Sequence, residues 1–226
     1  MPEAPNAVRE LASDPTSRKN FLRKAGGTGV AASLAVFVAA CGGDDSSSSM
    51  KSSTPATTPT PNTSGTEQFG KGDLGIANYA LTLEYLEAQF YSDAAESGML
   101  KGKILDLAKG FGAEEQEHVD ALIAMIKKAG GKPAAKPMAK FPLDSEMAIL
   151  KLAATVENLG ANAYLGQAGN IQDKEILAAA LSIHSVEARH AAVLNLATKA
   201  PVSSGAFAKP ATAAEVLKSV KPFLVS

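Results

Sequence analysis

Apolar residues recur at helical spacing along four long stretches of the chain after residue 66. In the first stretch they return every three or four positions until about Ser97, where Gly98 ends the run. Asp73 stands at the start of this stretch and is expected to be its N-cap. The apolar stripe consists of Leu74, Ala77, Leu81, Tyr85, Ala88 and Tyr91, and Glu84 falls within it. The pattern predicts a helix over residues 73–97.

Three further long helices are predicted, each followed by a stop signal. Their ranges are 103–129, 145–168 and 173–199, and they end at Gly130-Gly131, at Gly169-Asn170 and before Pro201. The connection that contains residues 133–142 is long and Pro-rich, whereas the other two are short. Thr212 and Glu215 form a capping-box pattern that predicts a short last helix. The chain is therefore expected to be all-α, with an up-down-down-up four-helix bundle and one long crossover, although the pattern alone permits other helical bundles.

Composition narrows the classes of partner. The 226 residues carry a formal net charge of -1, so no polybasic surface for nucleic acid is expected. Aromatic residues make up 5% and tryptophan is absent, which favours packed helices over a β-sandwich.

The first 40 residues have the layout of an export signal. A basic patch from Ser17 to Lys24 precedes an apolar, Gly-containing run over residues 25–40, which is too short for a typical membrane span. The patch resembles the twin-arginine signal, but Lys19 replaces the second arginine. Twin-arginine export is favoured on the motif, and the general secretory route stays open.

The single cysteine stands at the end of this signal. Val38-Ala39-Ala40-Cys41-Gly42 resembles a bacterial lipobox, in which the cysteine is lipidated; the alternative is an ordinary cleavage site. Residues 42–66 are rich in Ser, Thr and Pro and predict a disordered tether. The expected organisation is an export signal (1–40), a lipidated Cys41 with its linker (41–66), a helical bundle (67–200) and a tail with a short helix (201–226). We expect an exported bacterial lipoprotein on the outer face of the cell membrane.

Two of the three histidines follow a glutamate by three residues on predicted helices. These pairs are Glu115 with His118 and Glu187 with His190. Residues three apart lie on the same side of a helix, so each pair can reach one inward site.

The other two helices repeat one pattern, a glutamate in an apolar stripe with a tyrosine seven residues later. They carry Glu84 with Tyr91 and Glu157 with Tyr164. Four carboxylates and two imidazoles on facing helices are the ligand set of di-iron and di-manganese bundles, and two divalent ions would neutralise the carboxylates. The predicted metal ligands are Glu84, Glu115, His118, Glu157, Glu187 and His190. Tyr91 and Tyr164 are expected either to donate hydrogen bonds beside them or to pack in the core.

Several neighbouring residues have plainer interpretations. Glu114 and Glu117 are expected on a solvated face, and His184 in an ordinary hydrogen bond or at the surface. Glu84 is favoured over Glu87 as a ligand, because the position that matches Glu87 in the second helix pair is Gly160.

The motifs Leu-Glu-Tyr-Leu-Glu-Ala-x-Phe-Tyr and Val-Glu-Ala-Arg-His resemble those of the secreted ferritin-like domain proteins, within the ferritin-like superfamily. The resemblance extends from about Lys71 to Lys199. It implies that Glu115 and Glu187 bridge two metal ions, and that the remaining ligands, Glu84, His118, Glu157 and His190, are terminal.

The expected cofactor is a pair of Fe or Mn ions, since hard carboxylates with imidazoles suit these metals. The expected function is a reaction with dioxygen or peroxide, of ferroxidase or peroxidase type; the alternative is a non-catalytic metal-binding or stress-protection module. With one cysteine the chain cannot form a four-cysteine iron site, so an enzyme would need an external reductant. Fe or Mn, the substrate and homodimer formation are left open.

Overall fold

The computed structural model describes residues 65–225, and the predicted export signal, Cys41 and most of the linker lie outside this range. Its helices follow the predicted ranges to within about two residues. They are α4 (Gly72–Glu96), α5 (Gly102–Lys128), α6 (Glu146–Ala168), α7 (Lys174–Ala197) and α8 (Ala213–Val220), with short 3-10 turns at Glu67–Phe69 and Lys221–Phe223.

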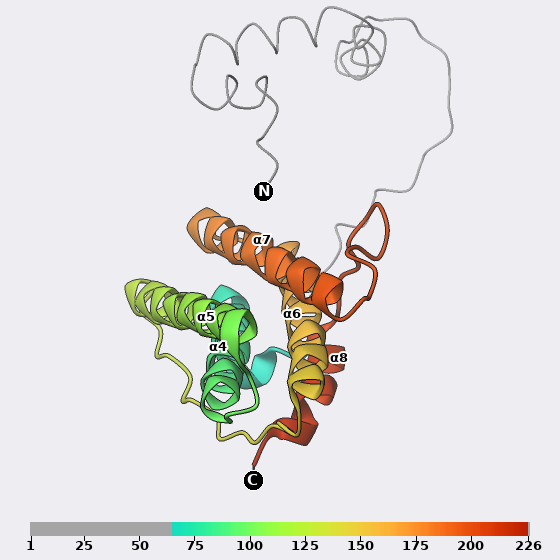
Figure 1. Cartoon of the computed structure of the whole chain (residues 1–226). Helices are drawn as coiled ribbons and strands as arrows, with labels where there is room; N and C mark the ends of the chain where they lie inside the picture. Colours follow the sequence, from blue (N-terminus) through green and yellow to red (C-terminus); the bar gives the residue numbers. More distant parts are fainter. Residues whose placement is uncertain (1–64, 226) are drawn as a thin grey trace, which may run out of the picture. The chain divides into compact units, whose positions relative to one another are not determined.

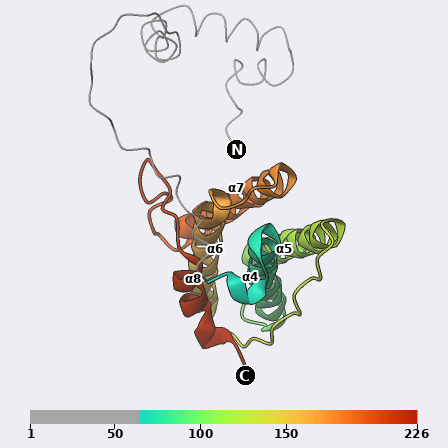
Figure 2. The same cartoon turned by 180° about the vertical axis from the view of Figure 1, so that it is seen from behind.

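The four long helices form two pairs, and the predicted all-α bundle is confirmed. α4 packs mainly against α5, and α6 against α7, while α8 lies on α6 (Figures 1 and 2). The α5–α6 connection is the long crossover. In the described residues the only extended pairing is an isolated bridge between Ala139 of this crossover and Leu224 near the chain end. The bundle therefore brings α4, α5, α6 and α7 around one interior.

Local capping contacts and glycines mark the helix ends, as the sequence predicts. The Thr212 hydroxyl accepts from the backbone of Glu215, whose side chain accepts from the backbone of Thr212, so the predicted capping box is confirmed. Asp173 caps α7 with its carboxylate alone, which accepts from two backbone N–H groups. Gly98 and Gly130 follow their helices with φ of 73° and 78°, a conformation that glycine adopts at little cost.

The prediction that Asp73 caps the first helix is wrong. Lys71 holds the N-cap position, and Asp73 lies inside the first turn of α4. Its carboxylate instead accepts hydrogen bonds from the backbone N–H groups of Gln172 (3.1 Å) and Asp173 (2.6 Å). Asp73 therefore joins the start of α4 to the loop before α7, a contact between distant parts of the chain that the local pattern does not encode.

The buried core consists of two apolar clusters, one towards each end of the bundle. The first includes Phe90, Tyr91, Phe111 and Phe141, and α8 contributes Val216 to it. The second is built from α4, α5, α6 and α7 around residues such as Leu81, Leu122, Tyr164 and Ile176. Between the clusters lies a layer of buried charged residues.

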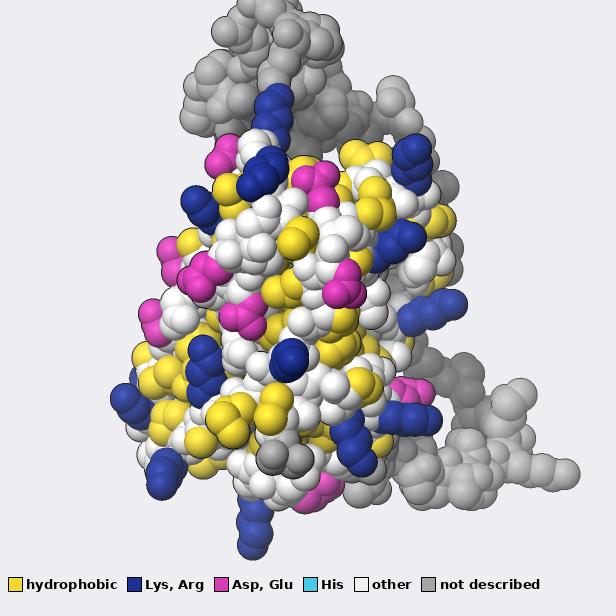
Figure 3. All heavy atoms as spheres, turned by 60° about the horizontal axis from the view of Figure 1, so that its bottom comes forward, with side chains coloured by type: hydrophobic (Ala, Val, Ile, Leu, Met, Phe, Trp, Pro, Cys, Tyr) yellow, Lys and Arg dark blue, Asp and Glu magenta, His cyan; other side chains and the backbone are white. Residues whose placement is uncertain are grey.

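The described surface is mixed. On the face that Figure 3 shows, lysine, arginine and acidic side chains alternate with hydrophobic ones, and no histidine comes into view. None of the helices in the described part of the chain combines the length and hydropathy that a membrane span requires.

Candidate metal centre

The structure brings all six predicted ligands together in the middle of the bundle. Each of the four long helices supplies one glutamate, and α5 and α7 add a histidine each. The four glutamates, Glu84, Glu115, Glu157 and Glu187, are fully buried. His190 is also buried, at 3% exposure, and the His118 side chain is 12% exposed.

The six side chains form two overlapping groups of ligand atoms. One group contains Glu84, Glu115, His118 and Glu187, and the other contains Glu115, Glu157, Glu187 and His190. In each group the atoms lie within 4.8 Å of one another. Both groups share one glutamate from α5, Glu115, and one from α7, Glu187. This is the arrangement expected where two ions lie side by side and share two carboxylates.

The imidazole nitrogens that face the interior are the Nδ1 atoms. His118 Nδ1 lies 2.8 Å from Glu115 Oε2 and 3.2 Å from Glu84 Oε2. His190 Nδ1 lies 2.9 Å from Glu115 Oε1 and 3.3 Å from Glu157 Oε2. The two oxygens of Glu115 thus approach different histidines, as a bridging carboxylate requires.

Several of these inward atoms have no hydrogen-bond partner in the described part of the chain. They are Glu115 Oε1, Glu157 Oε2, both oxygens of Glu187 and His190 Nδ1. The atoms approach one another, but not with hydrogen-bond geometry. Buried polar atoms normally have a partner, and leaving them without one destabilises the fold. Since the unpartnered atoms are the predicted ligand atoms, the residues present fit a pair of metal ions.

The charges of the cluster shift its pKa values strongly. Burial alone lowers the pKa of His118, but the close carboxylates of Glu115, Glu187 and Glu84 outweigh it and raise that pKa to about 12. His190 behaves likewise, with a pKa raised to about 11. Burial raises the pKa of Glu84 to about 7. Protons on the imidazoles thus offset the carboxylate charge in the metal-free protein, and bound cations would replace them.

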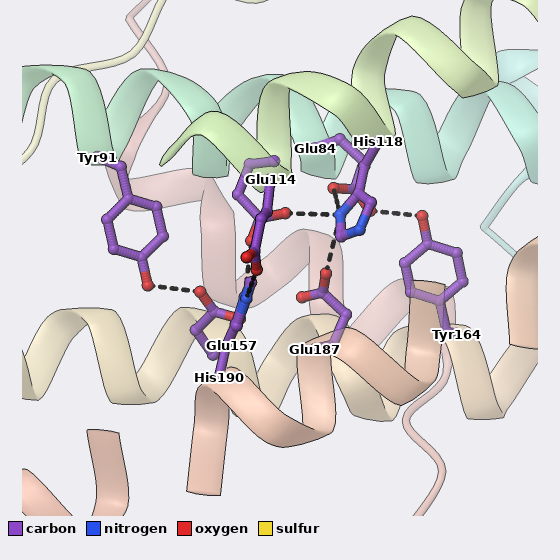
Figure 4. A network of polar contacts seen from close by, with 9 residues as sticks. Glu84, Tyr91, Glu114, His118, Glu157, Tyr164, Glu187 and His190 are labelled. Carbon is purple, nitrogen blue, oxygen red and sulfur yellow. Dashed lines mark hydrogen bonds and ion pairs between the residues drawn. The ribbon is translucent and has the colours of Figure 1, made fainter. Parts of the chain in front are cut away.

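Two tyrosines connect opposite helices through the ligands. The Tyr91 hydroxyl of α4 donates to Glu157 Oε1 of α6 at 2.5 Å. The Tyr164 hydroxyl of α6 donates to Glu84 Oε1 of α4, also at 2.5 Å (Figure 4). Of the two interpretations that the sequence left open, the structure shows both, because these tyrosines are buried in the core and also bond to the ligands.

Glu114 is a residue that the sequence analysis missed. It is half-exposed, as a solvated face predicts, but its Oε2 lies 2.5 Å from His190 Nε2. The His190 ring also stacks on Phe111, with centroids 3.8 Å apart. The position that matches Glu114 in the second helix pair is Val186. The repeat that indicated the six ligands therefore did not indicate Glu114. Glu117 is exposed, as predicted.

His184 and Glu87 lie at the edges of the cluster. His184 Nδ1 lies 2.9 Å from the backbone oxygen of Ala161, which is the ordinary hydrogen bond expected for it. Glu87 does not belong to either ligand group, yet it is buried at 5% exposure.

A surface hollow of about 470 Å³ leads to the histidine side of the cluster between α5 and α7. It is lined by His118, His190, Phe111, Glu114, Arg189 and neighbouring residues. A small molecule can therefore reach the imidazole side of the cluster.

The fold and the cluster together define a class, the four-helix bundle with a buried carboxylate–histidine cluster that is compatible with metal binding. Residues 72–200 match the model of the ferritin-like domain family, and the chain belongs to this family. No curated protein matches the chain. The crystal structure of a conserved hypothetical protein from Mycobacterium tuberculosis is similar, with a TM-score of 0.51 and 20% sequence identity. The match covers 60% of this chain and 96% of that one and shows the fold alone.

Proposed function

We propose that this protein binds two Fe or Mn ions and reacts with dioxygen or peroxide, as a lipid-anchored protein on the outer face of the cell membrane. The observation that carries the proposal is the sharing of Glu115 and Glu187 by two groups of ligand atoms. One ion would be held by Glu84 and His118 with the shared carboxylates, and the other by Glu157 and His190.

The terminal glutamates are prepared for binding through one oxygen each. Glu84 Oε1 accepts from Tyr164, which leaves Oε2 near His118. Glu157 Oε1 accepts from Tyr91, which leaves Oε2 near His190. Ligands that are oriented in this way need little rearrangement when a metal enters.

The bundle offers the oxidant an approach to the histidines. The hollow between α5 and α7 reaches both histidines, whereas the apolar clusters close the ends of the site. When bound, the metal pair would supply the two electrons that reduce one hydrogen peroxide and two protons to two waters. The half-exposed Glu114 at the hollow is positioned to exchange protons with solvent. Electrons must then return from an external reductant, since the chain has one cysteine and cannot build a four-cysteine iron site.

Metal analysis followed by a reaction with oxidant tests this function. The purified protein should bind two ions per chain. After anaerobic loading with Fe(II), it should consume peroxide or dioxygen faster than free Fe(II) does. Replacing Glu115 and Glu187 together by Ala should abolish stoichiometric binding, whereas His118→Ala or His190→Ala should mainly weaken one ion. Glu117→Ala, an exposed change on the same helix, is the matched control.

Full metal content in the double variant would contradict the site. If the protein binds metal stoichiometrically but consumes the oxidant no faster than free Fe(II) does, the enzyme interpretation is wrong. The alternative, a metal-binding or stress-protection module, would then hold.

A further inference from the structure

A fifth glutamate lies buried beside the six ligands. Glu87 stands one turn after Glu84 on α4 and is only 5% exposed. Its Oε2 has no hydrogen-bond partner in the described residues. The sequence pattern gave this residue little weight, because the second helix pair has Gly160 at the matching position. Its burial needs another explanation.

Gly160 makes the space that Glu87 occupies. A Cβ atom at Gly160 would lie 2.9 Å from Glu87 Oε1 and 2.8 Å from Glu187 Oε2. Any side chain at this position of α6 would therefore displace one of the two carboxylates. Glu87 Oε1 and Glu187 Oε2 thus border the same space beside Gly160. Glu187 Oε2 has no hydrogen-bond partner among the described residues.

The rest of the surroundings of Glu87 is apolar. Leu83, Leu86, Phe141, Val156 and Val216 line the pocket on this side of the site. Burial, and then the charge of Glu187, raise the pKa of Glu87 well above its usual value. A cation beside Glu187 would offset the charge of Glu87.

We propose that Glu87 is a fifth carboxylate ligand of the metal pair and enters beside Glu187, on the side away from the histidine-lined hollow. This inference rests on the metal binding of the proposed function. Four carboxylates neutralise two divalent ions, so a fifth gives the centre a net negative charge. Glu87 therefore stabilises the higher oxidation state of the ions, because that state carries more positive charge.

The competing explanation is that Glu87 is a buried neutral acid that fills space. Glu87→Gln separates the two, because the amide has the shape of the protonated acid but is a poor metal ligand. Gly160→Ala tests the same contact from the other side, since it keeps the carboxylate and fills its space. Gly110→Ala is the matched control, because Gly110 lies in α5 with nothing within 4 Å of an added Cβ.

The experiment loads the full chain with Co(II) and records visible absorption and binding isotherms. We expect two ions per wild-type chain. Glu87→Gln and Gly160→Ala should both change the cobalt spectrum and lower the affinity for one of the two ions at least about 10-fold. Gly110→Ala should have the spectrum and the affinities of the wild type. In the iron-loaded protein, Glu87→Gln should also raise the reduction potential.

Wild-type spectra and affinities in Glu87→Gln, with two ions still bound, would overturn the fifth ligand alone. A wild-type chain that binds neither Co(II), Mn(II) nor Fe(II) would overturn the proposed function as well. Circular dichroism of each variant shows that it is folded, and a Glu87→Asp variant that partly restores the cobalt spectrum would support direct ligation.

Discussion

The Tyr91 hydroxyl on α4 donates a hydrogen bond to Glu157 Oε1 on α6, across the centre of the bundle. Burial, and then the charge of Glu157, raise the pKa of Tyr91 well above its usual value, so the phenol stays a neutral donor. Tyr164 and Glu84 repeat the contact in the opposite direction. The two helix pairs are thus joined at the ligands themselves, and each terminal glutamate is oriented by the other pair.

Tyr91→Phe should lower the affinity for the ion held by Glu157 and His190 about 10-fold, because Glu157 loses the hydrogen-bond donor that fixes its orientation. Tyr164→Phe should do the same for the other ion. Phenylalanine keeps the packing of the ring, so the melting temperature should change little beyond the loss of one hydrogen bond. Mn(II) isotherms for both single variants check this, and unchanged isotherms would mean that the tyrosines serve packing alone.

Glu114→Gln should affect only one of the two ions. The carboxylate of Glu114 holds the outer nitrogen of His190, whereas no such contact to the outer nitrogen of His118 is seen in the described residues. Loss of this partner should lower the affinity for the ion at His190 by roughly 10-fold and leave the affinity for the other ion unchanged. Glu117→Gln, a change at another exposed glutamate of α5, is the control. Equal weakening of both ions would show a general loss of surface charge instead.

Removing the metal should make stability depend on pH. In the metal-free protein the pKa values of Glu84 (about 7), His118 (about 12) and His190 (about 11) lie above the ordinary 4.5 and 6.5. A group whose pKa is higher in the folded protein than in the unfolded chain stabilises the fold fully when the pH lies below its unfolded pKa. This stabilisation is lost as the pH rises through the pKa of the folded state. Glu115, with a pKa lowered to about 2, acts in the opposite direction, but only below about pH 4.5.

The free energy of unfolding of the chelated protein should therefore fall between about pH 5 and about pH 8, and Glu84 alone should contribute on the order of 3 kcal/mol to this fall. The melting temperature should fall with it. Excess Mn(II) should reduce the fall, because metal binding displaces those protons. Thermal melts at four pH values with chelator and with Mn(II) measure the difference. Parallel curves would show that the ions do not bind at these groups.

Cys41→Ser should leave an unanchored or unprocessed protein, because only the thiol can be lipidated. The wild type should enter the detergent phase on partitioning, and the variant should stay in the aqueous phase. The melting temperature of the folded part should be the same for both, since Cys41 precedes the described bundle. An identical distribution of the two proteins would refute lipidation.

The amino-acid sequence by itself determined the helices and the six candidate ligands. Helical spacing is local, so the side of each helix that carries Glu115 and His118, or Glu187 and His190, can be read from three-residue intervals. Gly98, Gly130 and Thr212 mark ends for equally local reasons. The repeat of Glu84 with Tyr91 and Glu157 with Tyr164 then relates the two helix pairs.

Only the tertiary structure decided which groups meet between helices. The exchange of tyrosine partners, the contact of Glu114 with His190, the link from Asp73 to the loop before α7, and the space at Gly160 depend on how far one helix is shifted and rotated against another. That offset results from packing of the whole core, so no interval along one helix encodes it. For the same reason, Glu87 was given little weight from the sequence, although it lies buried beside Glu187 in the folded protein.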